Sequence, residues 1–275
     1  MKTRVISGII IVVFFIAVIL FNTSFPLALN IAVALISLMS VHELVNAVGL
    51  GKKYMLYVPS IIIAGLIPFA GVLHISTFLL SAVYVLALFV GLIVCYKEIK
   101  FKDLAVVATM TLIMPQALSC IVSARDLSLE YGIFYAVIAV LAAWIPDTGA
   151  YFVGTLMGKH KLCPEISPKK TVEGFVGGIV CNGVIMMLLG FLWNIIFFGG
   201  EADLNLVSLL VIGLGGAVIS VIGDLSFSII KRNENIKDFG NLIPGHGGIL
   251  DRFDSVIFTA PYVYIILSFL PAFVG

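Results

Sequence analysis

The residues of this chain that could do chemistry include aspartates that stand within long apolar runs. Asp147 and Asp224 each lie in a run long enough to cross a membrane. A charged side chain inside such a span costs about 2.5–3.5 kcal/mol, so an acid found there usually has a partner or a task. For either residue taken alone, a carboxylate that satisfies a neighbouring helix end or a lysine is the alternative. Their surroundings favour a task in binding or catalysis.

Asp224 begins a polar stripe. On a helix, Asp224, Ser228 and Lys231 stand at positions i, i+4 and i+7 and share one face. The stripe starts within an apolar run and ends where that run meets Lys231 and Arg232. This arrangement suits a groove that admits an anionic head group from water while its apolar tails stay in lipid. A solvated helix end would explain only the lysine and the arginine.

A glycine-rich segment follows shortly after this stripe. Gly245, Gly247 and Gly248 surround His246 and leave backbone NH groups uncovered by side chains. A glycine-rich turn before a helix directs those NH groups, and the positive end of the helix, toward phosphate oxygens. The same kind of turn also occurs as a plain connector.

Asp251 and Asp254 come next, in what we expect to be the first turn of the last helix. They stand three residues apart and so occupy neighbouring positions on one face. Carboxylates beside a phosphate site repel it unless a divalent cation lies between them, and Mg²⁺ prefers a few carboxylate oxygens together with phosphate and water. Stabilisation of the helix dipole would account for either acid, but not for the glycines and His246 as well.

The window from Ser228 to Asp254 reads S-x-x-K-R, four residues, K-D, and then, after five more, P-x-H-G-G-x-x-D-R-x-D. This pattern resembles the signature of the phosphatidate cytidylyltransferase family, also called CDP-diacylglycerol synthases. Two upstream segments, Trp144 to Tyr151 and Ser167 to Gly174, fit the family as well. The resemblance covers the C-terminal half, whereas the first five spans resemble the family only in hydropathy and in the order of spans.

The resemblance implies that CTP and phosphatidic acid react to give CDP-diacylglycerol and pyrophosphate for phospholipid synthesis. It implies Mg²⁺ or another divalent cation as the cofactor, with a second, monovalent or divalent cation as an option. We assign Asp224 and Asp251 as metal ligands, and Asp147 and Asp254 as further ligands or as catalytic groups beside them. His246 would donate to a phosphate or protonate the leaving pyrophosphate, and a structural hydrogen bond within its turn is the alternative.

Cations, hydroxyls and glycines form a larger set of candidates for phosphate contacts. Ser167 can cap a helix with Pro168 at its first position, which leaves the two following lysines free to meet a phosphate. The alternative role for these lysines is to anchor a span on the cytoplasmic side, where lysines and arginines are enriched. The predicted substrate-binding residues are Ser167, Lys169, Lys170, Ser228, Lys231, Arg232, Lys237, Gly247, Gly248 and Arg252.

Long apolar segments must position all of these residues, because 61% of the 275 residues are hydrophobic and only 11% are charged. A membrane helix needs about 20 largely apolar residues. We therefore predict an all-α, polytopic membrane protein with about nine transmembrane helices in a single domain, residues 1–123 forming spans without a recognisable motif and residues 124–275 the catalytic spans. The predicted spans are Val5–Phe21, Pro26–Val41, Leu56–Leu73, Thr77–Tyr96, Leu104–Ser123, Ile133–Met157, Gly174–Phe198, Leu206–Ile230 and Phe253–Phe273.

The distribution of positive charge predicts the orientation. With a cytoplasmic N-terminus, 15 of the 16 lysines and arginines fall on the cytoplasmic side, and only Arg125 falls outside. The two long polar segments, residues 158–173 and 231–252, also face inward. We therefore expect a multi-pass protein of the inner or plasma membrane with its active site facing the cytoplasm.

Other function classes fit less well. A net charge of +1 with scattered lysines and arginines does not indicate nucleic-acid binding, and four widely spaced cysteines without a CxxC pair do not indicate a zinc or redox motif. A transporter is the main rival, because intramembrane acids and broken helices also build ion pathways, but we find no internal repeat. A nearer rival is a CTP-dependent enzyme that acts on another lipid phosphate or a lipid alcohol. The expected partners are CTP, phosphatidic acid and membrane lipids, and a homodimer follows from the resemblance alone.

Overall fold

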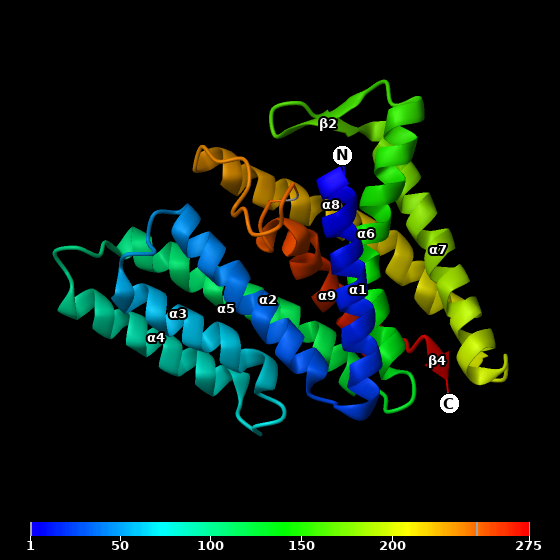
Figure 1. Ribbon diagram of the computed structural model, residues 1–275, viewed down its shortest axis with the longest axis horizontal. Coiled ribbons are helices and arrows are strands. Elements are labelled where there is room, and N and C mark those ends of the chain that lie inside the picture. The colour runs from blue at the N-terminus through cyan, green and yellow to red at the C-terminus, as the bar shows by residue number, and fades with distance from the viewer. Residues whose placement is uncertain (1, 246, 275) are drawn as a thin grey trace. The chain divides into compact units, whose positions relative to one another are not determined.

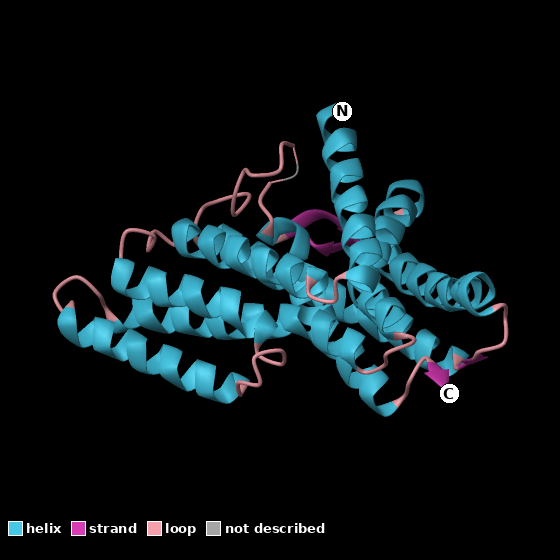
Figure 2. Cartoon of the chain, turned by 60° about the horizontal axis from the view of Figure 1, so that its bottom comes forward, coloured by secondary structure: helices cyan, strands magenta, loops and turns pink. Residues whose placement is uncertain are grey.

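The computed structural model describes residues 2–245 and 247–274, and this part of the chain is mainly α-helical. Figure 2 shows helices joined by loops, with only short strands. The class predicted from the sequence is therefore confirmed as a mainly α-helical protein. The helices are α1 (Lys2–Ser24), α2 (Ala28–Ala47), α3 (Tyr54–Leu66) with a 3₁₀ turn (Ile67–Phe69), α4 (Thr77–Val94), α5 (Phe101–Asp126), α6 (Gly132–Met157), α7 (Val172–Phe198), α8 (Leu206–Asn233) and α9 (Leu250–Phe269).

Two small antiparallel sheets accompany the helices. Strand β1 (Lys161–Cys163) pairs with β2 (Ser167–Thr171), and β3 (Asp203–Leu204) pairs with β4 (Phe273–Val274). The last predicted span, to Phe273, therefore ends earlier than expected, because the helix stops at Phe269 and the chain turns into β4.

Six of the described helices, α2 and α4 to α8, are long and apolar enough to cross a membrane. The segments Val13–Asn22 and Tyr54–Phe69 are shorter apolar helices. Helix α9, whose start carries charged residues, is not among the six. These helices indicate a multi-pass membrane protein, and the count of nine spans stays a prediction.

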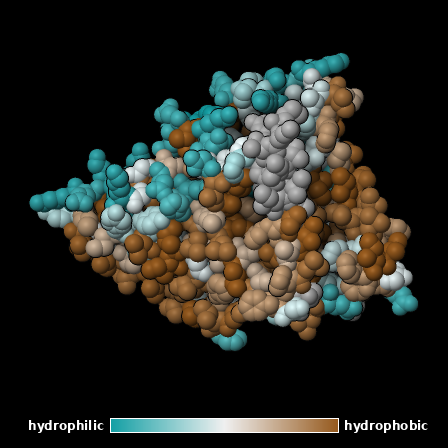
Figure 3. All heavy atoms as spheres, in the orientation of Figure 1, coloured by the Kyte–Doolittle hydropathy of each residue, from teal (hydrophilic) through white to brown (hydrophobic). Residues whose placement is uncertain are grey.

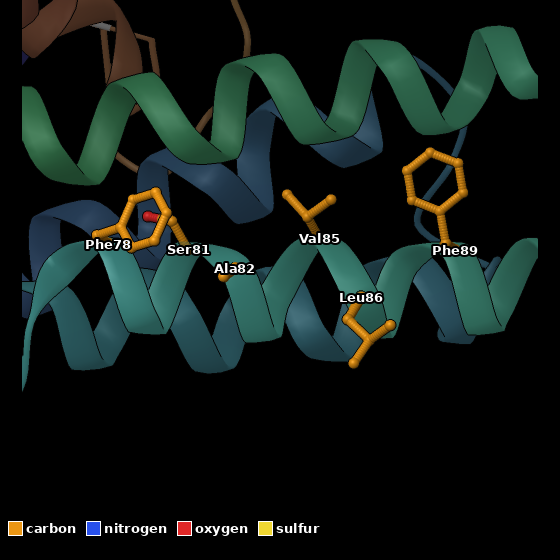
Figure 4. Close-up of a pocket in the computed structure, with 6 residues that line it drawn as sticks. All are labelled: Phe78, Ser81, Ala82, Val85, Leu86 and Phe89. Atoms are coloured by element: carbon orange, nitrogen blue, oxygen red, sulfur yellow. The ribbon is translucent and has the colours of Figure 1, made fainter.

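The exposed surfaces of the helices are apolar, as lipid requires. In Figure 3, hydrophobic residues cover most of the exposed flanks of the helices. On α4, the side chains of Phe78, Leu86 and Ile93 are all largely exposed. A shallow hollow on this helix, lined by Phe78, Ser81, Ala82, Val85, Leu86 and Phe89, offers one hydroxyl and no charge (Figure 4). It has no charged group to bind a phosphate.

The chain divides into two compact units. Unit 1 comprises Met1–Val122 and Glu234–Phe253, and unit 2 comprises Ser123–Asn233 and Asp254–Gly275. In unit 1, α3 packs against both α2 and α4, and Figure 1 shows these helices side by side. Helix α2 continues past Val41, the predicted end of the second span, to Ala47.

Unit 2 is built on the close packing of α6, α7 and α8. Asn182 of α7 is fully buried, and its side-chain amide donates to the carbonyl oxygens of Ala142 (3.3 Å) and Gly213 (2.7 Å). A Cβ atom on Gly213 would lie 2.7 Å from the Cα of Gly183. Small residues and interhelical polar contacts of this kind let membrane helices approach closely. This packing holds α6 and α8, which carry Asp147 and Asp224, next to α7.

We expect Gly213→Ala to destabilise the protein by about 1–3 kcal/mol, because the added methyl group must push apart two helix backbones. Thermal unfolding in detergent measures the loss. Gly71→Ala is the matched control, since a Cβ there meets no atom within 4 Å. Equal unfolding temperatures for the two variants would contradict the packing described for unit 2.

The segment before α7 corrects one prediction. Ser167 and Pro168 do not start a helix but belong to strand β2, where Ser167 pairs with Cys163. Helix α7 begins at Val172, and its cap is Thr171, whose hydroxyl oxygen accepts from the NH of Gly174 (3.1 Å). The cap and proline pattern alone did not distinguish a strand from a helix start, because the pairing with β1 decides the conformation.

Candidate functional site

Three aspartates of unit 2 form an acidic cluster, which we define as Asp147 of α6, Asp224 of α8 and Asp254 of α9. Asp254 is buried and interacts electrostatically with both Asp224 and Asp147. Helices α8 and α9 approach closely at Gly223, where a Cβ atom would lie 2.9 Å from the Phe258 ring. A larger residue at this position would separate Asp224 from Asp254.

Two lysines neutralise part of this cluster. The Nζ atom of Lys170 lies 2.6 Å from Oδ2 of Asp224, with both side chains about a quarter exposed. The Nζ atom of Lys231 lies 3.8 Å from Oδ2 of Asp254, and both of these side chains are buried. The three carboxylates of the cluster could bind a cation, and the two lysines could bind anionic groups of a substrate.

Helix α8 carries the polar stripe that the sequence predicts. Asp224, Ser228 and Lys231 all lie on α8, which ends at Asn233. Exposure rises at the end of the helix, from the buried Lys231 to the exposed Arg232. The Asp224–Lys231 stretch thus places two charged groups inside unit 2, and Arg232 is available to solvent.

The β1–β2 hairpin carries Lys169 and Lys170 on β2, and Figure 1 shows it beyond the ends of α6 and α7. Adjacent residues of a strand point to opposite sides, so Lys170 reaches Asp224 while Lys169 is exposed. Glu173 closes the hairpin, since its carboxylate lies 2.6 Å from Nδ1 of His160 and accepts from the backbone NH of Lys159. These contacts of Glu173 stabilise the hairpin, which can then hold Lys169 and Lys170 in place.

The glycine-rich segment lies in unit 1 and forms a tight turn. The NH of Ile243 donates to the carbonyl oxygen of Gly247 (2.9 Å). Gly245 and Gly247 have φ angles of +79° and +86°, which favour glycine. His246 lies outside the described residues, so its predicted role stays open. Lys237, before the turn, is exposed.

Asp251 binds back onto this segment. It is buried at the start of α9, and its Oδ2 atom accepts from the backbone NH groups of Phe239 (2.8 Å) and Gly248 (2.9 Å). The NH of Gly248, predicted to meet a phosphate, therefore donates to a carboxylate in this structure. Asp251 and Arg252 lie in the first turn of α9, and Asp254 lies just beyond it.

Sequence reasoning missed Glu43, a buried acid of α2. Its carboxylate accepts from the backbone NH groups of Ile249 (3.0 Å) and Leu250 (2.8 Å), where α9 begins. The signal in the sequence was an acid beside an apolar run, but the predicted span ended at Val41 and so left Glu43 outside it.

The carboxylate oxygens of the aspartates in the acidic cluster suit Mg²⁺. This ion takes one or two carboxylates and completes its ligands with phosphate and water. Among the residues that the structure describes, no group of three or more histidine, cysteine, aspartate or glutamate side chains is arranged to hold an ion by itself. A cation here would complete its ligands with phosphate oxygens or water, so the donor set fits a metal that is bound together with a phosphate group.

The sequence profile of the Cytidylyltransferase family matches residues 2–270. The chain belongs to this family. Curated relatives named phosphatidate cytidylyltransferase include proteins of Bacillus subtilis, 46% identical over 139 residues, and of Staphylococcus haemolyticus, 44% identical over 136 residues. These alignments cover 50% of this chain and 49% and 50% of the two relatives. Cytidylyltransferase family membership thus extends over nearly the whole chain, whereas the chain is aligned with about half the length of these relatives.

Proposed function

We propose that this protein transfers the cytidylyl group of CTP to phosphatidic acid, giving CDP-diacylglycerol and pyrophosphate. The observation that carries the proposal is the acidic cluster with Lys170 and Lys231 in unit 2 of a chain from the cytidylyltransferase family. The relatives named phosphatidate cytidylyltransferase support phosphatidate as the lipid substrate. The apolar flanks of the helices suit a substrate whose acyl chains stay in the membrane.

In this reaction a phosphate oxygen of the lipid attacks the α-phosphorus of CTP. The bond from the α-phosphorus to the oxygen that bridges it to the β-phosphorus breaks, and pyrophosphate leaves with that electron pair. The nucleophile is already an anion, so no base has to generate it. Catalysis is then mainly alignment of the two phosphates and neutralisation of their charge.

The side chains divide these tasks. Lys170 and Lys231 partner carboxylates in the structure, and they would turn to phosphate oxygens when a cation occupies those carboxylates. Lys169, Arg232 and Lys237 are exposed and would bind the triphosphate or the lipid phosphate from solvent. Arg252, at the start of α9, belongs to the same group of proposed contacts.

We also propose a divalent cation, Mg²⁺, which when bound would neutralise phosphate charge and polarise the α-phosphorus for attack. Asp224 and Asp251 are the proposed carboxylate ligands, with Asp147 and Asp254 as supporting acids. A second cation and a homodimer remain part of the proposal because the family resemblance implies them.

A pyrophosphate-release assay separates this function from transport. Purified protein in detergent is given CTP, Mg²⁺ and phosphatidate, and pyrophosphate is measured. We expect release that requires all three components. Release that is absent, or that proceeds equally without phosphatidate, would contradict the proposed transfer, and a transporter should release none.

The proposed topology places nine spans in the cell membrane with the active site facing the cytoplasm. In a cysteine-free background, we expect Lys237→Cys to resist an impermeant thiol reagent in intact cells and to react after permeabilisation. Glu201→Cys is the matched control, because this exposed residue is predicted to face outward and should react in intact cells. Labelling of position 237 from outside would overturn the orientation.

A further inference from the structure

Glu43 stands out among the buried acidic and basic side chains of the described residues because none of the proposed steps uses it. It lies within α2, and only 7% of its surface is exposed. Burial of a carboxylate costs several kcal/mol unless it is paired or well hydrogen-bonded. A buried acid in this place therefore needs a structural or functional reason.

The start of α9 supplies its partners. Oε1 of Glu43 accepts from the NH of Ile249 (3.0 Å), and Oε2 accepts from the NH of Leu250 (2.8 Å). The first NH groups of a helix have no partner within the helix and carry the positive end of its dipole. One carboxylate, from a residue 207 positions earlier than Leu250, thus satisfies two of these groups.

The surrounding loop is shaped to admit this carboxylate. A Cβ atom on Gly240 would lie 2.4 Å from Oε1 of Glu43, and one on Gly248 would lie 2.2 Å from Oε2. Both distances are far below van der Waals contact, so a side chain at either position would displace the carboxylate. The loop therefore closes around Glu43 at two glycines.

Asp251 holds the same loop as well, because it accepts from the NH groups of Phe239 and Gly248. Glu43 and Asp251 together engage consecutive NH groups, from Gly248 through Ile249 to Leu250. Both carboxylates therefore bind the backbone at the point where α9, with Asp251 and Arg252 in its first turn, begins.

We propose that Glu43 is a positioning residue for the proposed cytidylyl transfer, on which this inference rests. By holding the NH groups at the start of α9, it fixes where Asp251 and Arg252 point during the reaction. Its carboxylate accepts from these NH groups throughout the reaction, and a substrate phosphate does not displace it.

The test combines hydrogen–deuterium exchange with kinetics on full-length Glu43→Gln. The amide keeps the shape of the side chain but turns an NH₂ group toward one of the two NH donors. We expect the backbone NH groups of Ile249 and Leu250 to exchange about ten-fold faster or more, while exchange in α6 is unchanged. We also expect kcat to fall about ten-fold or more with the KM for CTP within about two-fold of wild type.

Three further variants guard against a general loss of stability. Ser37→Ala changes another buried polar residue of α2 and should leave exchange and kcat as in wild type. Gly213→Ala lowers stability in unit 2 and, below its unfolding temperature, should keep normal exchange at Ile249 and Leu250. Gly240→Ala displaces the Glu43 carboxylate without altering it and should reproduce the effects of Glu43→Gln, which keeps the test available if the glutamine variant does not fold.

Unchanged exchange at Ile249 and Leu250 in both Glu43→Gln and Gly240→Ala would overturn the inference. A lower KM for CTP in Glu43→Gln would overturn it as well, because that result marks Glu43 as a placeholder for phosphate. If wild type formed no CDP-diacylglycerol, the proposed function would fail, and the exchange experiment would still show whether Glu43 holds the start of α9.

Discussion

Asp224→Asn is expected to reduce formation of CDP-diacylglycerol to below about one-hundredth of the wild-type rate, because charge placed at a transition state is typically worth 10²–10³-fold. Asp224 forms an ion pair with Lys170 of the hairpin and interacts electrostatically with Asp254 of α9. Neutralising it would remove a proposed metal ligand and leave Lys170 without its carboxylate. An assay of labelled lipid product measures the effect.

The response to metal identifies the cause. In wild type, Mg²⁺ at 100 times its dissociation constant should add about 2.7 kcal/mol to the free energy of unfolding, measured as a thermal shift in detergent. Asp224→Asn should lose most of that shift. Asp203→Asn, the same chemical change at an exposed position of unit 2, should keep it. A full Mg²⁺ shift in Asp224→Asn would remove Asp224 from the metal site.

Asp251→Asn should abolish turnover too, but it is a less specific probe. The Asp251 carboxylate accepts two backbone NH groups, and an amide in its place presents a donor to one of them. Loss of a hydrogen bond to a charged group costs about 1.5–3 kcal/mol. We therefore expect this variant to be destabilised even without metal.

Lys169→Ala is expected to lower kcat/KM about ten-fold or more while leaving the unfolding temperature close to that of wild type. A charge-assisted contact to phosphate contributes about 1.5–3 kcal/mol, and about 1.4 kcal/mol corresponds to ten-fold in rate. Lys169 is exposed on β2, so no apolar packing depends on it. Arg252→Ala should have an effect of similar size on kcat/KM.

The matched control is Lys161→Ala, on strand β1 of the same hairpin and equally a surface lysine. This variant removes the same charge from the same small sheet and should retain wild-type kinetics. If Lys161→Ala and Lys169→Ala lowered kcat/KM by the same factor, the effect would come from general surface charge and not from a defined contact.

Local patterns predicted the helices and the polar stripe of α8. Apolar length places the long helices, and helical periodicity places Asp224, Ser228 and Lys231 on one helix, because both properties depend on neighbours within a few turns. The glycine-rich turn, and the place of Asp251 in the first turn of α9, follow in the same way from the glycines and from the acids after them.

Contacts between distant residues could not be predicted. From the sequence, Asp224 and Asp251 are carboxylates that await a cation, whereas the structure gives Asp224 a lysine and Asp251 two backbone NH groups. Glu43 reaches the start of α9 only because the chain folds back in unit 1. The strand conformation of Ser167 depends likewise on its pairing with β1.

Mass spectrometry of the lipid product tests the central claim most directly. Purified protein is incubated with CTP, Mg²⁺ and an equimolar mixture of phosphatidate, other lipid phosphates and a lipid alcohol. We expect CDP-diacylglycerol to form from phosphatidate together with one pyrophosphate per molecule. A cytidylylated or phosphorylated product from another lipid in the mixture, with phosphatidate left unconsumed, would contradict it.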